Sequence, residues 1–248
     1  MARPGIPDGP HPARVRDVML GGRDNFAADR EAAGRIEAMF PGARTLARQH
    51  REFARRATTW LASRGVAQFV DVGCGLPCPP TTGQVARETL PGARVAYADC
   101  DPLVLDRARR FLASEGAVVE ADPARPETAL DGPGLRGVID LSEPVGMLLC
   151  GVLSGMDGDA ARAAVAGYTA RLAAGSGIAI SVASWACQER GDEVAAAYKA
   201  TVGGTWYNHS RETVASFFSA AGLRPWPLLS GAANSRQVSV ISGVGLKQ

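Results

Sequence analysis

The chain has 248 residues, 46% of them hydrophobic, and a formal net charge of +2. That length supports one sizeable core in one or two domains, and the near balance of charge argues against a dedicated nucleic-acid binder. Residues 1–17 are polar and proline-rich, unlike a secretion signal, and no run of residues is apolar for long enough to span a membrane. We therefore expect a cytoplasmic protein without a membrane or nucleic-acid partner.

The chain starts with three amphipathic patterns that predict helices. They cover residues 11–20, 28–39 and 44–63, with breaks at the glycines after residue 20 and at Pro41-Gly42. Together they predict an N-terminal helical cover over residues 1–65. The remainder, residues 66–248, is expected to form one structural unit with this cover.

From residue 67 onward, short aliphatic runs alternate with helical patterns. The expected strands are 68–72, 94–98, 117–121, 145–150 and 177–184, and the expected helices between and after them are 83–90, 103–114, 159–173 and 193–200. This alternation predicts right-handed crossovers and a mostly parallel sheet. A helix over 211–221 and two strand-like runs, RPWPLL and RQVSVISG, then predict an antiparallel hairpin at the sheet edge.

The sequence DVGCGLPCPP, residues 71–80, follows the first strand at the edge where open α/β sheets bind ligands. Gly73 and Gly75 allow a sharp turn and a close approach of a ligand. Asp99, at the end of the next strand, has the spacing of a carboxylate that holds ribose hydroxyls; the alternative is a structural turn with a helix-capping aspartate. The three prolines lack the N–H groups that hold a pyrophosphate, so S-adenosylmethionine fits this loop better than a dinucleotide.

Five segments in chain order resemble the actinobacterial S-adenosyl methyltransferase family, whose substrates are mostly unassigned. They are ARVRDVMLGGRDNFAADREAAGRI, HREFARRA, QFVDVGCGLP, VAYADCDPLVLDRAR and VVEADPARPETAL. The resemblance implies an α/β, Rossmann-like class I methyltransferase fold. Its mostly parallel seven-stranded sheet would have an antiparallel last strand, and the helical cover would lie over the cofactor.

The resemblance also implies which residues bind the nucleoside. Gly73, Cys74 and Gly75 would line the methionine and ribose side, and Cys100 would flank the adenine beside the ribose-binding aspartate. Asp122 would accept a hydrogen bond from the adenine amino group, or else belong to a turn before the following proline.

The five cysteines are expected to be reduced and to serve as small apolar residues. Cys150 ends another expected strand and is a candidate lining residue of the cofactor pocket. Cys74 and Cys78 form the one closely spaced pair, and without a second pair no metal site is expected.

The methionine end of the cofactor carries an ammonium and a carboxylate. Candidates in the cover are Asp24 or Asp29 for the ammonium and Arg23 or Arg51 for the carboxylate, while Asn25 suits either. The alternative for this segment is a glycine turn before a helix that is capped by Asp29.

Departures from the family pattern fall on the expected substrate side. Arg16 stands where relatives usually carry a tyrosine, and Ser154 stands in a position where a histidine is common. With Trp206 and Tyr207, they are candidate substrate contacts that favour an acidic or aromatic small molecule.

His209 is the candidate general base and Asp24 the second candidate. The alternative is that His209 merely precedes a helix capped by Ser210.

The sequence thus predicts an S-adenosylmethionine-dependent methyltransferase that acts on a small molecule; a homodimer is compatible with the sequence. One alternative is an enzyme that cyclises the methionine moiety of S-adenosylmethionine to a small-ring amino acid and releases methylthioadenosine, since positioning alone selects the attacking group. The other is a binding module without catalysis.

Overall fold

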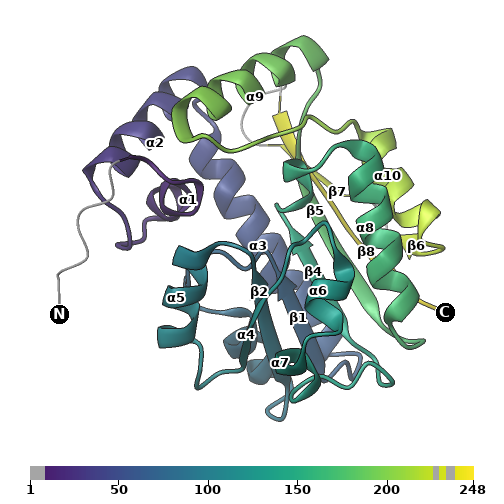
Figure 1. Cartoon of the computed structure of the whole chain (residues 1–248). Coiled ribbons are helices and arrows are strands. Elements are labelled where there is room, and N and C mark those ends of the chain that lie inside the picture. The colour runs from purple at the N-terminus through teal and green to yellow at the C-terminus, as the bar shows by residue number, and fades with distance from the viewer. Residues whose placement is uncertain (1–8, 226–228, 233–237) are drawn as a thin grey trace.

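The computed structural model describes residues 9–225, 229–232 and 238–248. Its sheet has the order β3-β2-β1-β4-β5-β8-β6, with β7 also paired to β8 (Figure 1). The strands are β1 (Gln68–Val72), β2 (Arg94–Asp99), β3 (Ala117–Glu120), β4 (Gly146–Cys150), β5 (Gly177–Trp185), β6 (Arg224–Pro225), β7 (Leu229–Ala232) and β8 (Val238–Leu246).

The first five strands are parallel, and β8 runs antiparallel to β5, which confirms the predicted α/β class I architecture. The described residues contain eight strands rather than the expected seven. The difference arises because β6 and β7 both pair with β8 as separate short strands. An antiparallel pair does form there between β7 and β8, but β7 begins at Leu229, the last residue of the expected run RPWPLL, so the predicted position of the first strand was wrong. Residues 226–228 and 233–237 lie outside the described residues.

Helices cover both faces of the sheet (Figure 1). One face carries α3 (Ala43–Ala62), α4 (Thr82–Thr89) and α5 (Pro102–Phe111), and the other carries α6 (Pro126–Leu130), α7 (Pro133–Arg136), α8 (Gly158–Arg171) and α10 (Arg211–Ala220). The sequence patterns located every one of these helices except the short α6 and α7.

Three further helices lie together beyond one end of the sheet (Figure 1): α1 (Pro12–Leu20), α2 (Ala27–Met39) and α9 (Gln188–Val202). The start of α9 was predicted five residues too late, because its first turn carries polar residues without an apolar periodicity. The N-terminal helices α1 and α2 and the much later helix α9 therefore place side chains over the same edge of the sheet.

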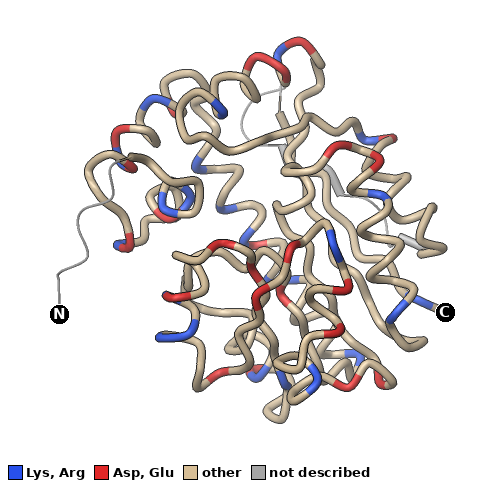
Figure 2. Tube along the Cα trace, viewed as in Figure 1, with Lys and Arg blue, Asp and Glu red and all other residues tan. Residues whose placement is uncertain are grey.

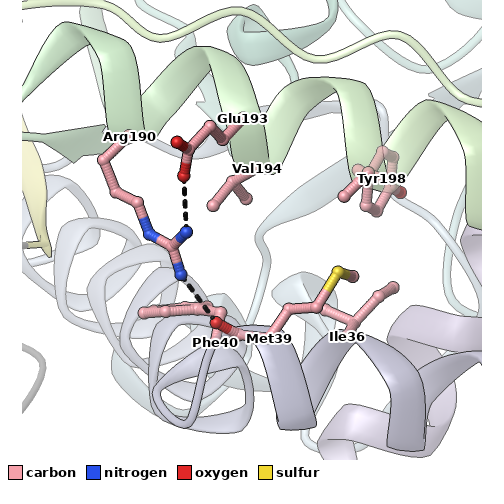
Figure 3. A pocket seen from close by; sticks show the side chains of 8 residues that line it. Ile36, Met39, Phe40, Arg190, Glu193, Val194 and Tyr198 are labelled. Carbon is pink, nitrogen blue, oxygen red and sulfur yellow. Dashed lines mark hydrogen bonds and ion pairs between the residues drawn. The ribbon is translucent and has the colours of Figure 1, made fainter.

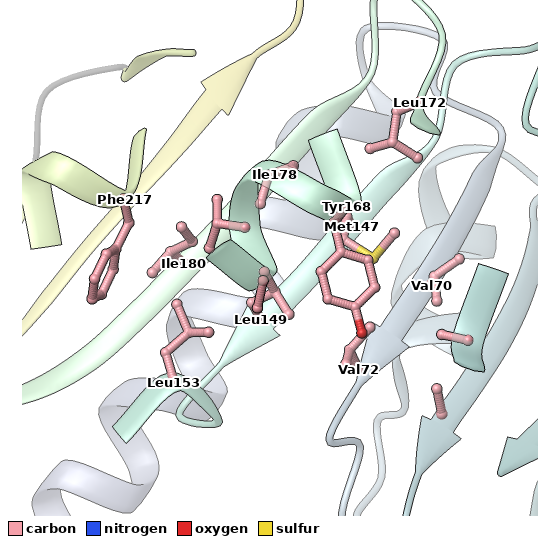
Figure 4. Packing of buried hydrophobic residues seen from close by; sticks show 14 of the residues in the cluster. Val70, Val72, Met147, Leu149, Leu153, Tyr168, Leu172, Ile178, Ile180 and Phe217 are labelled. Atoms are coloured by element: carbon pink, nitrogen blue, oxygen red, sulfur yellow. The ribbon is translucent and has the colours of Figure 1, made fainter. Parts of the chain in front are cut away.

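Alternating residues of the strands bury both faces of the sheet, as expected for parallel strands covered on two sides. On one face, Val70, Met147 and Ile180 pack with Tyr168 of α8 and Phe217 of α10 (Figure 4). The opposite face packs on α3 through a second apolar cluster that contains Phe53, Leu61, Phe69, Val95 and Leu148. The long helix α3 is therefore part of the sheet core as well as of the cover.

Charged positions of both signs are spread along the whole trace, and basic positions recur along α3 (Figure 2). In the ranges that the structure describes, no helix combines the length and the apolar character that crossing a membrane requires. Those ranges also hold no group of three or more His, Cys, Asp and Glu side chains placed to bind a metal ion.

Candidate functional site

A cavity of about 380 Å³ lies between the carboxyl ends of the central strands and the cover helices. Gly73 and Asp99 line it at the ends of β1 and β2, and Cys150 and Gly151 line it at the end of β4. Its opposite wall comes from α1, α2, α3, α9 and Trp206. This is the edge of an open α/β sheet at which ligands bind.

The glycine loop after β1 has a backbone that other residues rarely adopt. Gly73 and Gly75 have φ of 68° and 67°. A Cβ on Gly73 would also lie 2.7 Å from the Cγ2 atom of Val152, which leaves no room for a side chain. The Gly73 N–H donates to the Ala98 carbonyl at 2.8 Å, so the loop is fixed against β2.

Asp99 ends β2 beside this loop and is buried. One carboxylate oxygen accepts from the Gly75 N–H at 3.0 Å and the other from the Asp101 N–H at 3.0 Å. Burial raises the pKa of Asp99, and these two hydrogen bonds oppose that shift. The carboxylate is thus held rigidly at the wall of the cavity, with room for further hydrogen bonds on its two oxygens.

Asp71 and Arg51 lie behind the glycine loop, where they line a small recess with Cys74 and Gly75. The Asp71 carboxylate accepts from the Thr82 hydroxyl at 2.5 Å, and the Arg51 guanidinium donates to the Pro80 carbonyl at 2.9 Å. Burial raises the pKa of Asp71, while the positive charge of Arg51 lowers it. Asp71 was not among the residues predicted from the sequence, although an acidic residue within the aliphatic run of an expected strand is a visible signal.

Arg16 projects from α1 over the end of β4. A Cβ on Gly151 would lie 3.0 Å from the Arg16 Nη1 atom, so the guanidinium rests on the backbone there. Burial lowers the pKa of Arg16, and the charge of Arg51 adds to this effect. Arg16 lines the main cavity, as a substrate contact must.

His50 of α3 lies beside Arg16 in the cavity wall and was not selected from the sequence. Its Nδ1 atom is 2.8 Å from the Ser181 hydroxyl. Burial, helped by the charge of Arg16, lowers the pKa of His50 to about 3. The imidazole is therefore neutral near pH 7. The signal in the sequence was a histidine on the apolar face of a long helix.

The far end of the cavity has an aromatic wall. Trp185 packs edge-on against Phe40 with ring centroids 5.1 Å apart, and against Trp206 at 4.7 Å. Ser154 lies nearby in the lining, with a buried hydroxyl that has no hydrogen-bond partner among the described residues. A buried hydroxyl without a partner costs free energy unless a ligand or water satisfies it.

A second pocket, of about 250 Å³, lies between α2 and α9 (Figure 3). It shares Ile36, Phe40, Val194 and Tyr198 with the main cavity, so the two spaces adjoin. Arg190 bridges its rim, pairing with Glu193 at 2.6 Å and donating to the Met39 carbonyl at 2.9 Å (Figure 3).

The cysteines predicted at the cofactor pocket lie at strand ends as expected. Cys100 and Cys150 line the main cavity, and Cys74 lines the recess beside it. Burial raises the pKa of the Cys150 thiol to about 12 and that of Cys74 well above its usual range. Protonated thiols are poor nucleophiles, so these side chains act as small wall residues.

Both candidate general bases lie outside the cavity lining. The His209 Nε2 atom is 3.2 Å from the Leu153 carbonyl, and the ring packs on Phe217. This geometry matches the structural alternative for His209, which directly precedes the Ser210 cap of α10. Asp24 pairs with Arg107 at 3.3 Å. Tyr207, a candidate substrate contact, is 41% exposed and also outside the lining.

Asn25 and Asp29, on either side of the start of α2, are paired with groups of the same segment. The Asn25 amide donates to Asp17 at 2.8 Å and accepts from Arg30, and Arg23 is exposed. Asp29 accepts from the Phe26 N–H at 2.8 Å and so caps α2, as the alternative interpretation of this segment expected. None of these side chains lines the cavity.

Asp122 follows β3 and forms a turn of its own. One oxygen accepts from the Ala124 N–H at 2.9 Å and the other pairs with Arg125 at 3.0 Å. These contacts correspond to the turn alternative. The neighbouring Pro123, rather than Asp122, lines the cavity.

The sequence matches the family model described as S-adenosyl methyltransferase over residues 7–226. A DUF574 family protein from Streptomyces avermitilis MA-4680 is 28% identical, with a TM-score of 0.86 over 97% of this chain and 98% of that one. A candidate methyltransferase from Thermobifida fusca YX is 30% identical, with a TM-score of 0.84 over 97% and 96%. Human N-acetylserotonin methyltransferase, solved with S-adenosylmethionine, shares the fold at 13% identity and a TM-score of 0.52 over 97% and 63%. Comparison with curated proteins gives no match.

Proposed function

Since the chain belongs to the S-adenosyl methyltransferase family and uses S-adenosylmethionine as its cofactor, we propose that it methylates a small-molecule acceptor held in the main cavity. The observation that carries this proposal is the continuity of the cavity. Its Gly73–Asp99 end suits a nucleoside, and its Trp185–Trp206 end suits a separate apolar molecule. One lined space therefore connects a wall that suits a methyl donor with a wall that suits an acceptor.

The residues at the first end fit the cofactor. Gly75 has open space where a side chain would stand, which admits close approach, and the fixed carboxylate of Asp99 suits two neighbouring ribose hydroxyls. Arg51 and Asp71 add one positive and one negative group behind the loop, in a recess of about 10 Å³. Bound S-adenosylmethionine supplies an electrophilic methyl group on a positively charged sulfur.

The residues of the chain contribute position rather than proton transfer. His50 is the imidazole of the cavity wall, and a pKa of about 3 makes it a weak base at neutral pH. The aromatic wall excludes water and orients the acceptor. In the proposed step the acceptor atom forms a bond to the methyl carbon while the methyl–sulfur bond breaks and S-adenosylhomocysteine leaves. A proton released by the acceptor passes to water rather than to a side chain, and the rate enhancement comes from proximity and alignment.

Replacing Asp99 by alanine is expected to weaken the binding of S-adenosylhomocysteine by about 1–3 kcal/mol, because charge-assisted hydrogen bonds to the ribose are lost. Titration calorimetry measures this change. Asp99→Asn removes the charge but keeps one acceptor oxygen, which can bond either the Gly75 or the Asp101 N–H group. Asp106→Ala, which removes an exposed partner of Arg110, is the matched control and should bind normally. An unchanged dissociation constant in Asp99→Ala would refute the ribose assignment.

Product analysis tests the reaction itself. The purified protein is incubated with S-adenosylmethionine, with and without small-molecule acceptors, and the products are identified by mass spectrometry. S-adenosylhomocysteine together with a methylated acceptor supports the proposal. Methylthioadenosine formed without an acceptor supports cyclisation instead, and binding without any product supports a binding module. If calorimetry detects neither cofactor nor S-adenosylhomocysteine binding, the proposal fails.

A further inference from the structure

Of the charged residues that line the main cavity, one has a role in binding the proposed cofactor and the other has no acidic partner in the part of the chain that the structure describes. Among the described residues, the lining contains two formally charged side chains, Arg16 and Asp99, because His50 is neutral. Asp99 already accepts two backbone hydrogen bonds and faces the nucleoside end. Arg16 is thus the cation of the lining that needs a negative partner.

No acidic side chain of the described chain lies within ion-pair distance of Arg16. Asp71 attracts it from farther away, but the Asp71 carboxylate is held by Thr82 and is shared with Arg51. The other groups that face the guanidinium, Tyr198 and Cys150, are neutral near pH 7 since burial raises the pKa of each. A partly desolvated guanidinium without a counterion favours binding of an anion.

Ser154 gives a second and independent indication of a polar ligand. The residue is 3% exposed, its hydroxyl has no partner among the described residues, and it lines the same cavity as Arg16. Hydroxyl and guanidinium are both donors to a carboxylate. The adjoining edge-to-face rings of Phe40, Trp185 and Trp206 offer flat apolar surface suited to an aromatic ring.

We propose that the methyl acceptor is an aromatic carboxylic acid whose carboxylate pairs with Arg16 and Ser154 while its ring packs on the Trp185–Trp206 wall. This inference rests on the proposed methyltransferase function and names its substrate class. The anion offsets the positive charge that Arg16 and the sulfonium sulfur of the cofactor bring to one cavity. Arg16, Ser154 and Trp206 are accordingly specificity-determining residues.

Calorimetry with a matched pair of probes tests the substrate class. The protein saturated with S-adenosylhomocysteine is titrated with 4-hydroxybenzoate and with the neutral 4-hydroxybenzamide. We expect the acid to bind about tenfold more tightly than the amide, since one charge-assisted interaction separates them. Equal binding of the two probes, or no binding of either, overturns the assignment.

Variants locate the interaction. Arg16→Gln should abolish the preference for the acid, and Trp206→Ala should weaken both probes while leaving their ratio unchanged. Arg35→Gln, which removes an exposed arginine of α2, is the matched control and should behave as wild type. Circular dichroism and the affinity for methylthioadenosine establish that each variant is folded.

The competing assignment of Arg16 is to the carboxylate of the cofactor. In that case Arg16→Gln would weaken S-adenosylhomocysteine but not methylthioadenosine, which lacks the amino-acid moiety, and the acceptor proposal would be wrong. Failure of the wild type to bind S-adenosylhomocysteine at all would instead refute the proposed function. The two failures are therefore distinguishable.

Discussion

Replacement of Asp29 by alanine is expected to lower the free energy of unfolding by about 3–5 kcal/mol, because it leaves the buried guanidinium of Arg14 without its charge partner. The two side chains are 5% and 0% exposed and are joined at 2.7 Å. Asp29 also accepts from the N–H groups of His11 at 2.9 Å and Phe26 at 2.8 Å. The substitution therefore removes the link that holds the start of α1 against the first turn of α2.

Urea denaturation measures the global effect, and hydrogen exchange in residues 9–39 detects local loosening of the cover. Glu31→Ala is the matched control in the same helix, because its pair with Arg35 is exposed and should contribute no more than about 0.5 kcal/mol. The double substitution Arg14→Met/Asp29→Leu should recover part of the loss by removing the uncompensated charge. A loss below about 1 kcal/mol in Asp29→Ala, with unchanged exchange, would contradict this account.

Acidification is expected to destabilise the protein through His50 by about 2.5 kcal/mol between pH 7 and pH 4.5. The folded-state pKa is about 3, whereas an unfolded histidine titrates near its ordinary value of 6.5. The unfolded state therefore binds a proton first as the pH falls below about 6.5. Stability from this group is fully present above that pH and decreases as the pH falls towards 3.

His50→Gln isolates this contribution. Glutamine does not titrate and retains an amide that can bond the Ser181 hydroxyl, so wild type and variant should differ in how steeply stability depends on pH. Urea denaturation at pH 7, 6, 5 and 4.5 gives the two profiles. Asp71 and Asp99, whose pKa values are raised by burial, act in the opposite direction in both proteins and cancel in the comparison. Parallel profiles would show that His50 is not buried as a neutral imidazole.

The fold could be predicted because its signals are local. Strand β1 was expected over 68–72 and is observed there, and β2, β4 and β5 differ by one residue at an end. Aliphatic runs between glycine, proline and charged residues specify such strands directly. The division between β6 and β7 was missed, since the pairing of both with the long β8 is a long-range property.

Only part of the candidate site could be predicted from the sequence, because the rest depends on contacts between distant segments. Gly73 and Asp99 belong to loops whose spacing is fixed by one strand–helix–strand unit, so short-range reasoning places them correctly in the lining. His50 and Trp185 enter the cavity through packing between segments far apart in sequence. His209 attracted attention as a titratable residue beside aromatic ones, but its ring nitrogen bonds to the backbone of residue 153, a contact no spacing rule predicts.

The assembly of the cavity from separate segments has a consequence for protein engineering. The end proposed to bind the nucleoside is made by the loops after β1 and β2, whereas the aromatic end is made by the end of α2, the end of β5 and the segment that contains Trp206. Substitutions at distant sites without shared partners are usually additive. If the acceptor binds as proposed, a library restricted to Phe40, Trp185 and Trp206 is expected to vary the accepted molecule while the same methyl donor is retained.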